Sequence, residues 1–198
     1  MDARSHDPRR GDPRVHKLAG TRLRFDWGIV RYRLDVVATS VADAVEHAGG
    51  WLFDRAAAGW EVSVLVPEPD DDRPLRILGA EVLDLRAVLD TGGVDRRPHA
   101  IAVAAELIDW DARMADGLRR ALDDGGIQVV GWGANWPAVP EYRVDPVLHH
   151  LSAAAQVFKA QALAAAGVRA AATGPTETLC SGMAWWPPVV ADLSPVGG

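Results

Sequence analysis

The stretch Leu34–Pro67, LDVVATSVADAVEHAGGWLFDRAAAGWEVSVLVP, decides the fold because it contains a complete strand–helix–strand unit. Leu34–Ala38 is a short apolar run of the kind that forms a buried strand. Ser40 and Asp43 have the spacing of a helix start, where a hydroxyl and a carboxylate satisfy free amides of the first turn. Apolar residues then recur at helical spacing until a glycine, which can adopt the left-handed conformation that ends a helix. Val62–Val66 supplies a second strand, and two strands joined by one helix indicate a parallel pair in a layered α/β domain.

The rest of the chain continues this alternation of strands and helices. Ala100–Ala105 and Ile127–Val130 are predicted to be buried strands, with a helix between them that Asp109 or Asp111 caps. Asp145-Pro146 has the pattern of a helix cap followed by proline at the first helical position, and it predicts the start of the last helix. The predicted fold class is therefore α/β, a three-layer α/β/α sandwich with a mainly parallel, Rossmann-like sheet.

Length and composition fit one domain and exclude several classes of function. The chain has 198 residues, of which 48% are hydrophobic, as expected of a single core. Residues 1–20 are polar and predict a disordered tail, residues 187–198 predict a flexible Pro/Gly tail, and 21–186 remain as the single domain. The net charge of −6 argues against a nucleic-acid partner. No apolar run reaches the roughly 20 residues of a membrane span, and no secretory signal is present, so we expect a soluble cytoplasmic protein without a membrane partner.

Several motifs occur in the order found in one enzyme family. They are an apolar strand end, a Gly-Gly pair, a helix exit with a valine-rich strand, an Arg-rich turn and a late helix with a lysine: Val36–Ala38, Gly49-Gly50, Ala58–Val66, Arg73–Ala80 and Lys159–Leu163. In these residues the chain resembles the PIG-L or LmbE-like deacetylases, zinc enzymes that remove an acetyl group from N-acetylglucosamine-type substrates. The resemblance covers roughly residues 30 to 170, and its first part is the specific one.

The chain departs from this family where the zinc chemistry resides. In the family, a His and the second Asp of a His-Pro-Asp-Asp motif bind zinc, and the first Asp is the general base. The matching positions are Ser40, Ala42 and Asp43, so Asp43 is the one family ligand retained. A later family motif supplies a ligand His, but its counterpart Asp109–Met114 contains none, and Met114 takes the ligand position. Since a hydrolytic zinc site needs three protein ligands and a base, the resemblance implies a retained scaffold with no catalytic residue and no cofactor.

Two classes of function follow, and the sequence leaves open whether the protein is an enzyme. The first is a pseudoenzyme that has lost zinc-dependent N-acetyl-sugar deacetylation and binds a small molecule or a protein partner. In open α/β sheets, ligands bind beyond the carboxyl ends of the strands. The polar and aromatic residues predicted there are Thr39, Ser40, Glu106, Asp109, Trp132, Asn135 and Trp136. The second class is an active metal-dependent deacetylase or hydrolase whose zinc lies in a rebuilt site, made from Asp43, His47, Glu106 and Asp109 or Asp111.

Several of these residues also have a purely structural interpretation. Asp43 has the position of a carboxylate that stabilises the first helical turn, and His47 that of an ordinary histidine on the same helix face. Gly49-Gly50 lies inside a helix, where each glycine costs about 1 kcal/mol relative to alanine, and this indicates a close backbone approach. The rings of Trp132 and Trp136 could either stack on a ligand or fill gaps in the core.

Overall fold

The computed structural model describes residues 31–92, 97–133, 136, 143–169, 174–183 and 192–196. All of them belong to one compact unit, Arg31–Gly198. Its strands are β1 (Arg33–Val37), β2 (Glu61–Val66), β3 (Glu81–Asp84), β4 (Ala100–Ala104), β5 (Gln128–Trp132), β6 (Arg143–His150), β7 (Thr176–Met183) and β8 (Leu193–Pro195). Its helices are α1 (Val41–Ala57), α2 (Arg73–Ile77), α3 (Leu85–Asp90), α4 (Ala112–Asp124) and α5 (Ala153–Ala165), with a short 3-10 turn at Ala105–Leu107.

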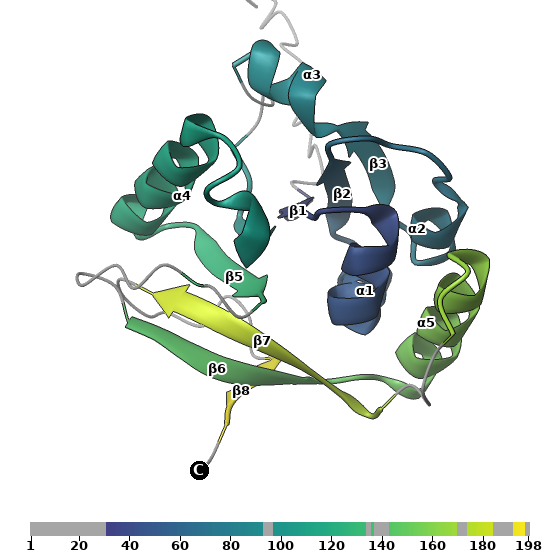
Figure 1. The fold of residues 1–198 in the computed structure, drawn as a ribbon. Helices are drawn as coiled ribbons and strands as arrows, with labels where there is room; N and C mark the ends of the chain where they lie inside the picture. Colours follow the sequence, from purple (N-terminus) through teal and green to yellow (C-terminus); the bar gives the residue numbers. More distant parts are fainter. Residues whose placement is uncertain are drawn as a thin grey trace, which may run out of the picture. The chain divides into compact units, whose positions relative to one another are not determined.

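The strands form one mixed sheet in the order β3-β2-β1-β4-β5-β7-β6-β8 (Figure 1). The five strands from β3 to β5 pair in parallel, whereas β7, β6 and β8 add antiparallel pairs. β1 and β2 are parallel neighbours, with Leu34 opposite Val62 and Val37 opposite Leu65, as the strand–helix–strand unit predicts. The α/β class is confirmed, but the prediction of a mainly parallel sheet is wrong.

Part of the error in the sheet comes from one misread helix start. Asp145-Pro146 lies inside β6, where Pro146 is opposite Cys180 of β7. The last helix begins later, and its cap is Ser152, whose Oγ accepts a hydrogen bond from the Ala155 amide at 3.0 Å. Pairing along both edges of β6 outweighs the local signal of an Asp-Pro cap. Leu193–Pro195, within the segment predicted as a flexible tail, is the strand on the outer edge of β6.

Helices lie on both faces of the sheet and bury two separate apolar clusters. Figure 1 shows α1, α2 and α5 on one side of the parallel strands and α4 on the other. Leu34 and Val36 of β1 belong to the cluster under α1, and Val37 belongs to the cluster under α4, because successive strand residues point to opposite faces. The apolar face of α1 that the sequence predicts is buried: Val41, Ala44, Val45, Ala48 and Leu52.

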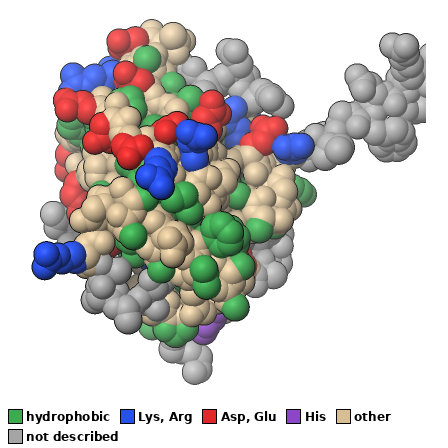
Figure 2. Space-filling model, turned by 90° about the vertical axis from the view of Figure 1, so that its right-hand side faces the viewer, with side chains coloured by type: hydrophobic (Ala, Val, Ile, Leu, Met, Phe, Trp, Pro, Cys, Tyr) green, Lys and Arg blue, Asp and Glu red, His purple; other side chains and the backbone are tan. Residues whose placement is uncertain are grey.

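The face that carries α2 and α5 has an uneven distribution of charge. Figure 2 shows charged side chains gathered over one part of this face and hydrophobic side chains interspersed over the rest. Val157 and Phe158 of α5 are exposed, and the Phe158 ring stacks on Phe53 of α1 with centroids 4.5 Å apart. In the part of the chain that the structure describes, no helix is both long and apolar enough to cross a membrane.

The Gly-Gly pair marks a close approach, as its sequence predicts, but the two glycines differ. A Cβ on Gly50 would lie 2.3 Å from the Leu151 side chain, whereas a Cβ on Gly49 would meet nothing closer than 3.4 Å. Gly50 is therefore required at this contact, because real Cβ atoms are not found this close to other heavy atoms.

A buried ion pair meets the backbone of α1 at the same point. Glu177 of β7 accepts hydrogen bonds from the amides of Gly50 (2.8 Å) and Trp51 (2.9 Å). Lys159 of α5 donates to Glu177 (2.6 Å) and to the carbonyl of Glu46 (2.7 Å). In a regular helix the Glu46 carbonyl accepts from the Gly50 amide, so this ion pair contacts both groups of one helical hydrogen bond. It ties α1, α5 and β7 together.

Candidate functional site

Asp43 is the centre of a hydrogen-bonded cluster beyond the carboxyl end of β1. Its Oδ1 accepts a hydrogen bond from Trp132 Nε1 at 3.0 Å, and its Oδ2 accepts one from the Thr39 amide at 2.9 Å. His47 Nδ1 lies 3.0 Å from the same Oδ1. Ser40 caps α1, with its Oγ accepting from the Asp43 amide at 3.1 Å. Both carboxylate oxygens of Asp43 are thus satisfied by groups of the protein itself.

Trp132 reaches this cluster from the end of β5 and is itself buried, with 3% of its surface exposed. Its ring lies parallel to the His47 imidazole, with an interplanar angle of 8° and centroids 6.1 Å apart. Burial alone would raise the pKa of Asp43, but hydrogen bonds from His47, Thr39 and Trp132 together lower it. The hydrogen bond with Asp43 raises the pKa of His47. Both shifts favour the charged forms, so the pair is an ion pair around mildly acidic pH.

The other predicted carboxylates, Glu106, Asp109 and Asp111, lie in the turns that follow β4 and precede α4. Glu106 is exposed in the turn after β4, and a Cβ on Gly133 would lie 2.8 Å from its Oε1, so it borders the end of β5. Asp109 is exposed ahead of α4. Asp111 caps α4 by accepting from the Arg113 amide at 2.8 Å, and hydrogen bonds from Arg113 lower the pKa of Asp111 to about 2. The predicted cap is confirmed for Asp111.

Met114 and Trp136, which were also predicted at the site, lie in apolar surroundings. Met114 is buried in the cluster under α4. Trp136 packs against the same cluster, and its ring occupies the space where a Cβ on Gly131 would lie. Its Nε1 is buried without a hydrogen-bond partner among the described residues. The two tryptophans therefore serve opposite faces of the sheet, since Trp132 belongs to the cluster under α1. Asn135 lies outside the described residues.

A second polar network was not anticipated from the sequence. His149 of β6 is 3% exposed, and its Nε2 lies 2.9 Å from Asp54 Oδ2. Ser152 Oγ donates to Asp54 Oδ1 at 2.6 Å, and Arg55 donates to Asp192 at 2.7 Å. The network joins α1 to β6 and to the residue before β8. Its role is to hold these elements together, and no local sequence signal pairs residues so far apart in the chain.

The residues present do not fit a hydrolytic zinc ion. Such an ion needs three protein ligands and an open position for water. In the described ranges, no three His, Cys, Asp or Glu side chains gather in a way that could hold a metal. Ala42 has no group that can take a proton, and the Ser40 hydroxyl caps a helix. The rebuilt set predicted from the sequence yields one close pair, Asp43 and His47.

The parallel core is an α/β scaffold with polar residues after β1, β4 and β5, at the edge where open α/β sheets bind ligands. Solved structures that are similar to this chain in fold include deacetylases. One is described as antimicrobial reagent A40926 pseudoaglycone deacetylase Dbv21; its TM-score is 0.55 at 15% identity, covering 79% of this chain and 99% of that one. Another is a deacetylase–teicoplanin complex from teicoplanin biosynthesis, with a TM-score of 0.50 at 15% identity, covering 77% and 98% of the two chains.

A third similar structure is described as the zinc-inhibited form of teicoplanin deacetylase Orf2, with a TM-score of 0.50 at 14% identity, covering 77% of this chain and 98% of that one. At these identities the likeness is one of fold, and at that level it confirms the resemblance to the PIG-L/LmbE-like deacetylases. No protein-family model and no curated protein sequence matches the chain.

Proposed function

We propose that this protein is a non-catalytic protein on a deacetylase-like scaffold, and that it binds a small molecule or a protein partner. The observation that carries the proposal is the state of Asp43. Its two carboxylate oxygens accept hydrogen bonds from Trp132 and Thr39, and His47 lies beside it. Asp43 acts here as a structural carboxylate that joins α1 to β5.

The loss of activity follows from what these side chains can do. The Trp132 indole N–H is a hydrogen-bond donor and has no lone pair to offer a metal. It donates to Oδ1 of Asp43, an oxygen with which Asp43 would bind a metal. Removing a general base typically costs a factor of about 100 to 10,000 in rate, and Ala42 stands at the base position of the related family. Loss of the metal also removes the activated water.

The alternative is an active metal-dependent hydrolase with zinc in a rebuilt site. Its support is the 3.0 Å contact between Asp43 and His47, which supplies two of the three ligands needed. Asp111 is less suited to complete it, because it is bound to Arg113. A cytoplasmic location and the absence of a nucleic-acid partner remain predictions from composition.

A deacetylation assay on N-acetylglucosamine derivatives with added zinc tests the proposal. We expect no turnover by the natural chain. The same assay is run on His47→Ala and on the variant Ser40→His, Ala42→Asp, Met114→His, which restores the family residues. Zinc-dependent turnover by the natural chain that disappears in His47→Ala would overturn the proposal in favour of the rebuilt site.

A further inference from the structure

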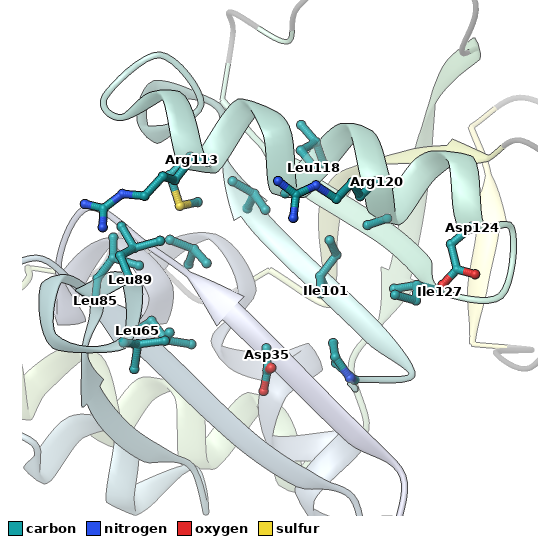
Figure 3. Close-up of a pocket in the computed structure, with 17 residues that line it drawn as sticks. Asp35, Leu65, Leu85, Leu89, Ile101, Arg113, Leu118, Arg120, Asp124 and Ile127 are labelled. Atoms are coloured by element: carbon teal, nitrogen blue, oxygen red, sulfur yellow. The ribbon is translucent and has the colours of Figure 1, made fainter. Parts of the chain in front are cut away.

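An open pocket lies on the face of the sheet that carries α3 and α4, away from the Trp132 side (Figure 3). Its volume is about 390 Å³, and its floor is formed by β1, β2 and β4. On this face α3 has six residues, against 17 in α1 on the other face. Small-molecule sites typically measure about 300–1,000 Å³, so the size suits a small ligand.

Most of the residues that line this pocket are aliphatic. Representative residues from floor and walls are Val37, Leu65, Leu89, Ile101, Leu118 and Ile127. No aromatic ring is among the described lining residues, so a flat aromatic ligand would find no ring to stack on. A flexible aliphatic chain is the shape and chemistry that such a surface accommodates best.

Gly117 belongs to the wall of the pocket that α4 forms. It lies in the interior of α4, where glycine costs about 1 kcal/mol relative to alanine, and it lines the pocket. A Cβ on Gly117 would have no heavy atom within 4 Å. No contact explains this glycine, in contrast to Gly50 and Gly131. A side chain can therefore be added at this position without a clash with the described residues.

Among the charged groups that line the pocket in the described part of the chain, one cation has no ion-pair partner. The partnered ones pair as follows: Arg113 with Asp111 and Asp90, Asp124 with Arg97, and Asp35 with Arg33. Arg120 of α4 has no such partner among the residues that the structure describes. Figure 3 shows it on α4 above the strands of the floor. A guanidinium beside an apolar surface favours a carboxylate, because its planar donors match the two oxygens.

We propose that this pocket binds a small amphipathic carboxylate with an aliphatic chain, the chain lying on the floor and the carboxylate at Arg120. Asp35 fixes the orientation. It lies in the floor, 6% exposed, and is already paired with Arg33, so the described residues of the floor offer no unpaired cation to an anionic group. The anionic end therefore lies at the rim and the apolar end at the floor.

Calorimetric titration of the full chain with octanoate tests this proposal. Octan-1-ol and octylammonium, which carry the same chain with a neutral or cationic end, are titrated in parallel. We expect octanoate to bind most tightly and octylammonium least tightly. Absence of octanoate binding, equal affinity for the three probes, or preference for octylammonium would each overturn the proposal.

Three variants locate the site. Gly117→Leu fills the pocket and should weaken octanoate binding at least about fivefold, as overpacking of a filled site does. Arg120→Gln should weaken it about two- to fivefold, the range of a partly exposed ion pair. Arg119→Gln is the matched control, since this substitution removes the same charge from α4. Arg119 pairs with Asp116 and lies outside the lining. Thermal melts verify that each variant folds. Unchanged affinity in Gly117→Leu, or equal effects of Arg119→Gln and Arg120→Gln, would contradict the assignment.

Discussion

Asp43 stands at the position of a zinc ligand in the family that the sequence resembles, but it has the contacts of a structural residue. It accepts from the Thr39 amide at the start of its own helix and from Trp132 of a strand that begins 85 residues later in the chain. Its neighbour His47 completes an i,i+4 pair on α1. A single carboxylate thus stabilises the first turn of α1 and joins that turn to β5.

The Asp43–His47 pair predicts a pH-dependent contribution to stability. The folded-state pKa of His47 is above 6.5, so its contribution is fully present below 6.5 and is lost as pH rises through the folded pKa. The folded-state pKa of Asp43 is below 3.8, so its contribution is present above 3.8 and is lost as pH falls through the folded pKa. The pair should therefore stabilise most between these two values.

Urea unfolding of the natural chain and of His47→Gln, over a series of pH values, measures this contribution. The difference in unfolding free energy should be below about 1 kcal/mol and should shrink above neutral pH. His150→Gln, at an exposed position, is the control for removal of a histidine. A difference for His47→Gln that stays constant from acidic to alkaline pH would contradict the assignment.

Gly49 and Gly50 provide a matched pair at adjacent positions of α1. Gly50→Ala should destabilise the protein by about 1–3 kcal/mol, because the new Cβ would lie 2.3 Å from buried Leu151. Gly49→Ala should be neutral or stabilising by up to about 1 kcal/mol, since it adds helix propensity without a clash. The urea midpoints of the two variants measure this difference. Equal destabilisation by both substitutions would show that the close approach of Leu151 to Gly50 is wrong.

At the scale of elements, sequence motifs predicted those helices and strands whose ends depend on contacts between residues close together in the chain. The start of α1 at Ser40, the cap of α4 at Asp111 and the parallel pairing of β1 with β2 were all predictable. β6 was not, because Asp145-Pro146 mimics a helix start and the partners that make it a strand lie far along the chain. The mixed character of the sheet follows from β6 together with β7, which pairs antiparallel with both β5 and β6.

The Lys159–Glu177 pair makes a prediction about how α1, α5 and β7 are joined. Lys159→Met should cost about 3–5 kcal/mol, because it leaves the Glu177 carboxylate buried without its counter-charge. The double variant Lys159→Met, Glu177→Leu should remain destabilised, since the amides of Gly50 and Trp51 lose their acceptor. Chemical unfolding measures both. Recovery of natural stability in the double variant would show that the contact with the α1 backbone contributes nothing.

At the scale of the whole molecule, the sequence placed the candidate residues at one edge but could not assign their contacts. The order of the parallel strands brings Asp43, Glu106 and Trp132 to the carboxyl end. The hydrogen bond from Trp132 to Asp43 joins residues 89 positions apart, and a spacing of that length carries no local pattern. The opposite placement of Trp132 and Trp136 likewise depends on the path of the chain after β5.

The central claim, that this deacetylase-like scaffold carries no zinc site, is tested most directly by metal analysis. The full chain is purified without chelator, incubated with zinc, freed of unbound metal and measured by atomic emission. We predict a zinc content far below one ion per chain, unchanged in Asp43→Asn, because the site lacks a third ligand. Stoichiometric zinc that is lost in Asp43→Asn and in His47→Ala would contradict the claim and assign the metal to a rebuilt site.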